Sequence, residues 1–152
     1  MKRFFFQFET ILQTKTMLEK QHLNELARLK EIEKNLTLEY DAIASEYREN
    51  TEKYLTRSSF GIRAHDMECY SNYAAIMRRA MDKKLNEIKA VKKEQDKERK
   101  LLIEVRKERN MLESLKEKKH QEFLEQVEKE ALKLLDERIA FDTCAGGLHV
   151  AK

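Results

Sequence analysis

Apolar residues recur along the first third of the chain at alternating steps of three and four, the spacing of a coiled-coil seam. One lane runs through Leu29, Leu36 and Ile43 with Asn50 next in register, and the other runs through Leu26, Glu33, Tyr40, Tyr47 and Tyr54. Leu12, His22 and Leu23 extend the stripe less regularly toward the N-terminus. The pattern predicts a first amphipathic helix over about residues 8–56.

A second periodic stretch follows with the same spacing. Its lanes are Tyr70, Met77, Lys84, Val91, Glu98, Val105 and Leu112, and Ala74, Met81, Ile88, Gln95, Leu102 and Arg109. The seam is polar around Gln95 and Glu98 and apolar again from Leu101 to Leu115. A further apolar stripe in shifted phase holds Phe123, Val127, Ala131, Leu134 and Leu135. These lanes predict a second helix over about 65–140, followed by a tail, 141–152, that we expect to be disordered because it has no periodicity.

Between the two stretches, residues 57–64 form a predicted turn. The segment contains Ser58, Ser59 and Gly61, and these residue types favour non-helical backbone. Asp66 and Glu68 follow, and negative charge suits the first turn of a helix. The prediction is an all-α fold: a long antiparallel two-helix coiled-coil hairpin with a longer second helix, forming a single domain over 1–140.

A reversal in this turn sets which residues face each other. Tyr47 should lie near Met77, Leu29 near Glu94 or Gln95, and the N-terminal phenylalanines opposite about residue 118. The second helix then outruns the first by roughly 20 residues, or ~30 Å at a rise of ~1.5 Å per residue. Apolar residues in this overhang lack an intramolecular partner, so they mark a contact site, with local dimerisation or fraying as the alternatives.

Composition supports long helices. The chain has no proline, only 3 glycines, and 39% charged residues, mostly Glu, Lys and Arg. Positively and negatively charged residues are interleaved, and the net charge is +3. This pattern is typical of a solvated helix surface and not of a face that binds nucleic acid. We expect no nucleic acid partner, no transmembrane segment, no signal peptide and a cytoplasmic location.

No residue pattern indicates catalysis, because a two-helix hairpin has no enclosed site in which reacting groups converge. We predict a protein that is not an enzyme, with no cofactor and no metal. Cys69 and Cys144 are expected to be free thiols, and no histidine is expected to pair with a cysteine as a metal ligand.

The residues around the turn carry a more specific resemblance. Residues 61–73 read Gly-Ile-Arg-Ala-His-Asp-Met-Glu-Cys-Tyr-Ser-Asn-Tyr, and residues 6–12 read Phe-Gln-Phe-Glu-Thr-Ile-Leu. With Glu46-Tyr47-Arg48 and Leu135-Asp136-Glu137, they resemble the FliJ family of flagellar type III export proteins over about residues 4–140. A Ser or Thr cap is common after Gly-Ile in that family. Arg63 stands there in this chain, which leaves Ser59 as an alternative cap.

The resemblance implies a central stalk for the hexameric flagellar export ATPase, which also contacts the cytoplasmic domain of the export-gate membrane protein and export chaperones. It implies a location in the cytoplasm, peripherally associated with the inner membrane at the flagellar base. The implied export-gate residues are Tyr40, Ile43, Tyr47, Tyr73, Met77 and Ala80. The expected ATPase residues, at the two chain ends, are Phe4, Phe6, Phe8, Leu12, Phe123, Leu134 and Leu135.

Other interpretations remain open at this point. Tyr40, Tyr47 and Met77 are seam positions, so their first role is packing, and the phenylalanines would close the open end of the hairpin. A stalk of a virulence-type secretion system and a generic coiled-coil or nucleic-acid-binding scaffold are the alternative functions. A membrane-surface role for Lys2-Arg3-Phe4-Phe5-Phe6 is weaker, since one short segment binds lipid marginally.

Overall fold

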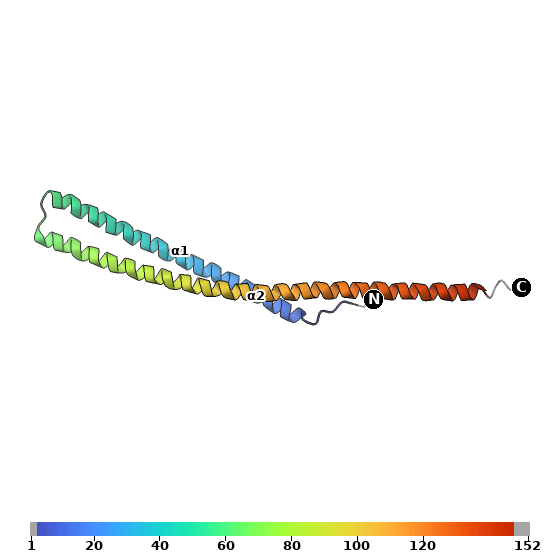
Figure 1. The fold of residues 1–152 in the computed structure, drawn as a ribbon. Coiled ribbons are helices and arrows are strands. Elements are labelled where there is room, and N and C mark those ends of the chain that lie inside the picture. The colour runs from blue at the N-terminus through green and yellow to red at the C-terminus, as the bar shows by residue number, and fades with distance from the viewer. Residues whose placement is uncertain (1–2, 148–152) are drawn as a thin grey trace. The chain divides into compact units, whose positions relative to one another are not determined.

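The structure, a computed structural model, describes residues 3–147 and consists of two helices joined by a short loop (Figure 1). Helix α1 spans Glu9–Ser59 (51 residues) and α2 spans Ala64–Gly147 (84 residues). The helices pack against each other and no strand occurs among the residues described. The predicted all-α hairpin with a longer second helix is therefore confirmed.

Two compact units divide the chain, and each is described by itself. The hairpin unit is Leu18–Val105 and contains the loop with the helix segments on either side of it. The terminal unit combines Met1–Met17 with Arg106–Lys152, so far as these residues are described. The predicted single domain over 1–140 stays a prediction.

In the hairpin unit the predicted lanes form the interface between α1 and α2. Every lane position from Tyr70 to Val105 on α2, and from Leu26 to Tyr54 on α1, is buried or half-buried. Leu23 is exposed, so its predicted place in the seam is wrong. The same steps continued below Leu26 reach His22 and Glu19, which are less exposed than Leu23. At this end of the hairpin unit, polar residues occupy the seam positions. Whether a side chain of α1 faces α2 therefore depends on its position in the heptad and not on its polarity.

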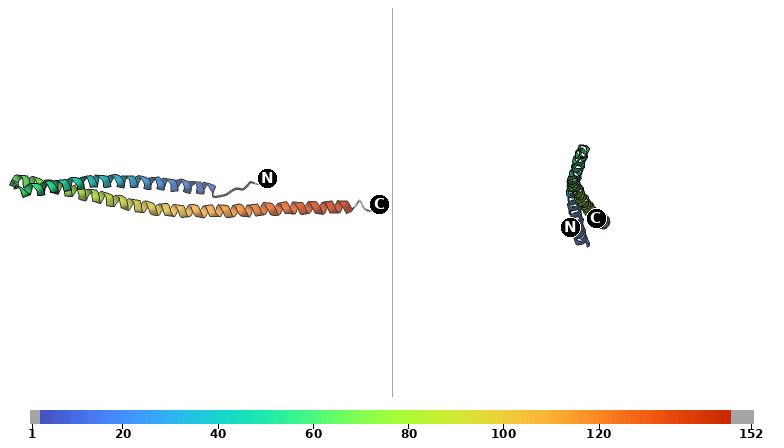
Figure 2. Two further views of the ribbon diagram at one scale, coloured as in Figure 1. Left: turned by 90° about the horizontal axis from the view of Figure 1, so that it is seen from above. Right: turned by 90° about the vertical axis from the view of Figure 1, so that its left-hand side faces the viewer.

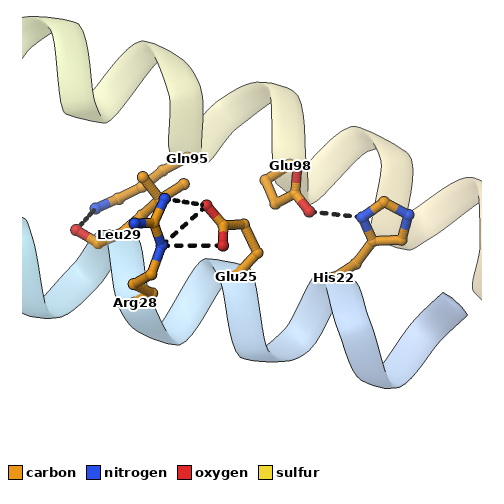
Figure 3. A network of polar contacts seen from close by, with 6 residues as sticks. All are labelled: His22, Glu25, Arg28, Leu29, Gln95 and Glu98. Carbon is orange, nitrogen blue, oxygen red and sulfur yellow. Dashed lines mark hydrogen bonds and ion pairs between the residues drawn. The ribbon is translucent and has the colours of Figure 1, made fainter. Parts of the chain in front are cut away.

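Contacts between the helices confirm the predicted register. The Gln95 side chain donates a hydrogen bond from Nε2 to the Leu29 backbone oxygen at 3.3 Å, as the Leu29–Gln95 pairing requires (Figure 3). The guanidinium of Arg78, the neighbour of Met77, donates to the Tyr47 hydroxyl at 2.9 Å. Lys84 Nζ lies 2.6 Å from Glu39 Oε2.

A polar layer interrupts the apolar seam at mid-length. Gln95 is only 3% exposed and also donates to Glu33 Oε2 at 2.7 Å, while His22 Nδ1 lies 2.5 Å from Glu98 Oε1 (Figure 3). A buried amide that lost these acceptors would be costly, so the layer penalises any shift of one helix along the other. A single polar seam residue fixes register in this way at some cost in stability.

The turn needs a residue without a side chain at one point. Gly61 has φ of 93°, a backbone conformation that side chains disfavour, although a Cβ there would meet nothing within 4 Å. The Ser59 hydroxyl donates back to the Thr56 oxygen at 2.7 Å within the last turn of α1. Ser59 is therefore not the cap of α2, and the alternative proposed for it is wrong. Helix α2 begins directly after Arg63.

In the terminal unit the start of α1 and the segment before it pack on α2. Glu9 Oε2 lies 2.7 Å from Lys116 Nζ, and Lys15 pairs with Glu108. The Phe4 ring lies 5.0 Å from the His120 ring and 5.7 Å from the Phe123 ring, as centroid distances. These contacts confirm that the N-terminal phenylalanines face the region around residue 118.

Helix α2 continues well beyond the N-terminal segment, as the left view of Figure 2 shows. It ends at Gly147 and so extends past the predicted end near residue 140. Residues 148–152 lie outside the described part, and the predicted disorder of the tail stays a prediction. No proline interrupts the helix, and the first helix-weakening pair is Gly146-Gly147. The Thr143 hydroxyl donates to the Ile139 oxygen at 2.7 Å, which adds a bond to this last stretch.

The neighbouring leucines 101 and 102 test the seam. Leu102 is 8% exposed and Leu101 is 45% exposed. Leu102→Ala should lower the free energy of unfolding by about 2 kcal/mol or more, because it removes buried methyl groups and leaves a gap. Leu101→Ala, the matched control, should change it by less than about 0.5 kcal/mol. Urea unfolding followed by circular dichroism measures both changes. An equal loss of unfolding free energy in the two variants would contradict the burial of Leu102 in the seam.

Candidate interaction surfaces

The structure offers surfaces rather than an enclosed reaction site. Among residues 3–147, no group of three or more His, Cys, Asp or Glu side chains converges as a metal site would require. Neither helix, over the same range, has a stretch long and apolar enough to cross a lipid bilayer. The candidate sites are therefore exposed apolar and aromatic side chains.

The residues expected to contact the export gate lie in the hairpin unit on both helices. Tyr73 is 40% exposed. The others are half-buried in or beside the seam: Tyr40, Ile43, Tyr47, Met77 and Ala80. Burial shows that these five residues contribute first to helix packing, and it leaves Tyr73 as the most accessible of the set.

Tyr47 and Tyr73 present their hydroxyls to different sides of the seam. The Tyr47 hydroxyl accepts from Arg78, whose guanidinium carbon lies 5.5 Å from the centre of the Tyr47 ring. The Tyr73 hydroxyl donates to Glu46 Oε2 at 3.4 Å. Tyr73 and Arg78 are five residues apart on one helix, which separates them by about 140° around its axis. The two tyrosines therefore do not form a single patch.

A hollow of about 410 Å³ opens on the Arg78 side near the turn. Residues of both helices line it, namely Tyr47, Asn50, Thr51, Tyr54, Leu55, Met67, Tyr70, Ser71, Ala74, Ala75 and Arg78. Sequence reasoning missed Arg78 and Leu55 as surface residues. The heptad pattern does not identify Arg78 and Leu55, because both residues flank the seam. The hollow that they line exists only when the two helices are packed together.

Ion pairs in the hairpin unit shift the pKa values of their own side chains. Hydrogen bonds from Lys84 to Glu39 and then Glu87 raise the pKa of the Lys84 ammonium above its ordinary value. A hydrogen bond with Glu49 raises the pKa of Lys53, and the same bond lowers the pKa of Glu49. Lys84 therefore stays charged at a seam position, held between carboxylates of both helices.

The residues expected to contact the ATPase separate into a packed group and an exposed group. Phe6 and Leu12 are buried, at 6% and 8% exposure, and Phe4 and Phe123 are half-buried against each other. Phe8 is exposed, although its ring lies 5.8 Å from that of Phe6. The packed residues hold the N-terminal segment on α2, so their substitution would disturb local structure as well as any contact.

A second hollow, of about 350 Å³, borders the N-terminal segment in the terminal unit. It is lined by Phe4, Phe5, Phe6, Gln7, Phe8, Leu115, Lys119, Glu122, Phe123 and Gln126. Lys119 Nζ lies 2.8 Å from Glu122 Oε2, and this hydrogen bond lowers the pKa of the Glu122 carboxyl. The hollow thus combines aromatic walls with one ion pair on its edge.

A further exposed apolar surface follows on α2, and we call it the C-terminal stripe. Its exposed members are Leu124, Val127, Leu132, Leu134, Leu135, Ile139 and Phe141. At 100° per residue they fall on about one half of the helix, which Glu128 and Arg138 also share, and Lys129, Lys133, Asp136 and Glu137 lie on the other half. Sequence analysis found Leu134 and Leu135 but missed Ile139 and Phe141, although Phe141 continues the seven-residue step from Leu134.

The sequence analysis overlooked one spacing of a histidine and a cysteine. His65 and Cys69 stand four residues apart on α2, and the structure places His65 Nε2 and Cys69 Sγ 3.8 Å from each other. Both side chains are exposed, and Cys69 is a free thiol. Helical spacing alone predicts this neighbourhood, since side chains at i and i+4 share a face.

These features define a two-helix coiled-coil protein that offers apolar and aromatic surfaces along its helices. The chain belongs to the FliJ family: the family model described as "Flagellar FliJ protein" matches residues 4–143. No curated protein and no solved structure matches the chain. Membership makes it a flagellar export-associated protein, of a structural family that is not known as a family of enzymes.

Phe5 and Phe6 provide a matched test of the packed N-terminal segment. Phe6 is buried and Phe5 is 84% exposed. Phe6→Ala should accelerate amide hydrogen exchange at residues 8–12 by about tenfold, since the segment loses its buried anchor on α2. Phe5→Ala should leave exchange unchanged. Mass spectrometry of peptic fragments measures both rates, and equal effects would contradict the packing of Phe6.

Proposed function

We propose that this chain is a non-enzymatic component of the flagellar type III export apparatus that acts as the central stalk of the hexameric export ATPase. The observation that carries the proposal is the C-terminal stripe, an exposed apolar helix face beside the N-terminal aromatic segment. Both chain ends lie in one unit, the terminal unit, so one partner can contact them together. Family membership supports the flagellar assignment over a virulence-type system.

The stripe suits a protein partner for a physical reason. Large apolar side chains on a helix with a charged opposite face lose unfavourable water contact when a second surface covers them. Leu134 and Leu135 are 67% and 56% exposed, so most of their area is available for burial. A helix that spans many turns without interruption also provides the stiffness that a shaft inside a ring requires.

The hairpin unit is the proposed contact for the cytoplasmic domain of the export gate. Tyr73 is the accessible member of the implied set, and the half-buried Tyr47 carries the Arg78 guanidinium over its ring. Tyrosine and arginine are the residue types that dominate binding energy in protein interfaces. Tyr40, Ile43, Met77 and Ala80 would support this contact by holding the helices in register.

Two further roles complete the proposal. Export chaperones are the third class of partner that the family resemblance implies, and peripheral association with the inner membrane at the flagellar base would follow from gate contact. Interleaved charges and a net charge of +3 favour protein partners over nucleic acid. A salt titration separates the two, because phosphate contacts lose affinity steeply as salt rises.

The stalk role predicts a specific loss on the C-terminal stripe. Leu134→Ala/Leu135→Ala should weaken binding to the export ATPase by about tenfold or more and abolish stimulation of its hydrolysis, because the apolar anchors are removed. Co-purification and ATPase rates measure the two effects.

The matched control for the stripe uses the opposite helix face. Lys133→Ala/Asp136→Ala changes the neighbours of the two leucines and should leave binding and stimulation within about twofold, since exposed charges contribute little. Undiminished binding by the leucine variant would remove the stripe from the ATPase contact. Circular dichroism should show equal helix content in both variants.

The gate contact predicts that Tyr73 matters more than other exposed apolar residues of the hairpin unit. Tyr73→Ala should weaken binding to the gate's cytoplasmic domain by about tenfold. Leu38→Ala, at another exposed apolar position on α1, should have no effect. Isothermal titration calorimetry measures both affinities. If Arg78→Ala alone weakened binding, the partner would contact the other side of the seam.

A further inference from the structure

We propose that the C-terminal stripe pairs with the same stripe of a second copy of this chain, with the two α2 helices antiparallel. The inference goes beyond the stalk role, since it concerns the chain by itself. Every residue from Leu124 to Phe141 is exposed, and the seven large apolar side chains of the stripe are 40% to 72% exposed. No other described segment of the terminal unit therefore covers this face.

The stripe is symmetric about position 133. Between positions 127 and 139, the residues on its half of the helix are Val127, Glu128, Ala131, Leu132, Leu134, Leu135, Arg138 and Ile139. Each of them lies as far before position 133 as another lies after it, and the apolar ones match apolar ones. A two-fold symmetric contact needs such a pattern, because residue i of one copy faces residue j of the other while j faces i. Facing residues of an antiparallel pair then have numbers that sum to about 266.

The two charged residues within this symmetric part of the stripe select the antiparallel direction. Glu128 and Arg138 are equally far from position 133 and have opposite charges. Antiparallel pairing places Glu128 of each copy beside Arg138 of the other, so two ion pairs form across the contact. Parallel pairing would instead bring Glu128 beside Glu128 and Arg138 beside Arg138, and like charges that face each other are unfavourable. Among the side chains described, neither residue forms an ion pair within its own chain.

The apolar area of the stripe suits a reversible dimer. The seven large apolar side chains of both copies together would bury on the order of 1,000 Å² of surface, at the lower end of the range for specific complexes. We therefore expect dissociation in the micromolar range. The dimer covers Leu134 and Leu135, the leucines of the proposed ATPase contact. A second copy and the ATPase would thus compete for one surface.

Sedimentation equilibrium of the full chain alone tests the pairing, and we expect a reversible equilibrium between monomer and dimer. Glu128→Arg and Arg138→Glu should each weaken dimerisation by about tenfold or more, because each places two pairs of like charges in the contact. The double variant Glu128→Arg/Arg138→Glu should recover the parent affinity, since both ion pairs form again with their signs exchanged. Lys129→Glu, a charge reversal on the opposite half of the helix, is the control and should change the affinity by less than about twofold.

Two results of sedimentation would overturn the proposal: a chain that stays monomeric at all micromolar concentrations, and a dimer whose affinity neither single charge reversal changes. A spin label on Gln121→Cys, in a Cys69→Ser/Cys144→Ser background, reports the direction of the pair. Antiparallel pairing separates the two labels by about 35 Å along the helix axis, at a rise of ~1.5 Å per residue. Labels that lie side by side would show a parallel pair and contradict the proposal. Since the ATPase is absent from these measurements, their failure would leave the stalk role standing.

Discussion

The packing of two narrow stripes against each other is the interaction on which the rest of this structure depends. Neither helix has an apolar face wide enough for a globular core, and among the side chains described, those of residues 3–143, only Phe6, Leu12 and Leu102 are buried apolar ones. Stability is therefore distributed along the seam, with each turn adding a small amount of burial. Such an arrangement tolerates half-buried tyrosines and a charged lysine in the interface, because the polar ends of these side chains keep a path to solvent.

This thin seam also explains why polar contacts carry the specificity of the fold. The short loop after α1 limits sliding of the two stripes, and the Gln95 amide adds a restraint because its bonds to Leu29 and Glu33 form in this alignment. His22 with Glu98, and Lys84 with Glu39, repeat the restriction elsewhere in the hairpin unit. Fixed register in turn decides which aromatic side chains face the partner, so the surface that carries the proposed gate contact depends on buried polar groups.

The exposed apolar surface has a different distribution in the two units. In the hairpin unit the aromatic residues are shared between packing and surface, as Tyr47 and Tyr73 show. In the terminal unit α2 continues past the N-terminal segment, and the C-terminal stripe is left with its apolar side chains exposed. Among the described residues, exposed apolar helix faces therefore accompany hollows in both units. Membership of the FliJ family is consistent with that, since its members act in export assemblies rather than as known enzymes.

Heptad spacing, the absence of proline and one turn segment were enough to predict the hairpin, because they admit few alternatives. The register could be predicted too, from Leu29 beside Gln95 to Phe4 near His120, since residues are counted outward from a single turn. The exposure of side chains at the seam edge became visible only once the helices were packed: Tyr73 and Arg78 lie on different sides, and Leu23 turns outward while Glu19 is buried. The reason is that exposure depends on the partner helix that covers each flank, and no spacing within one helix records what its neighbour covers.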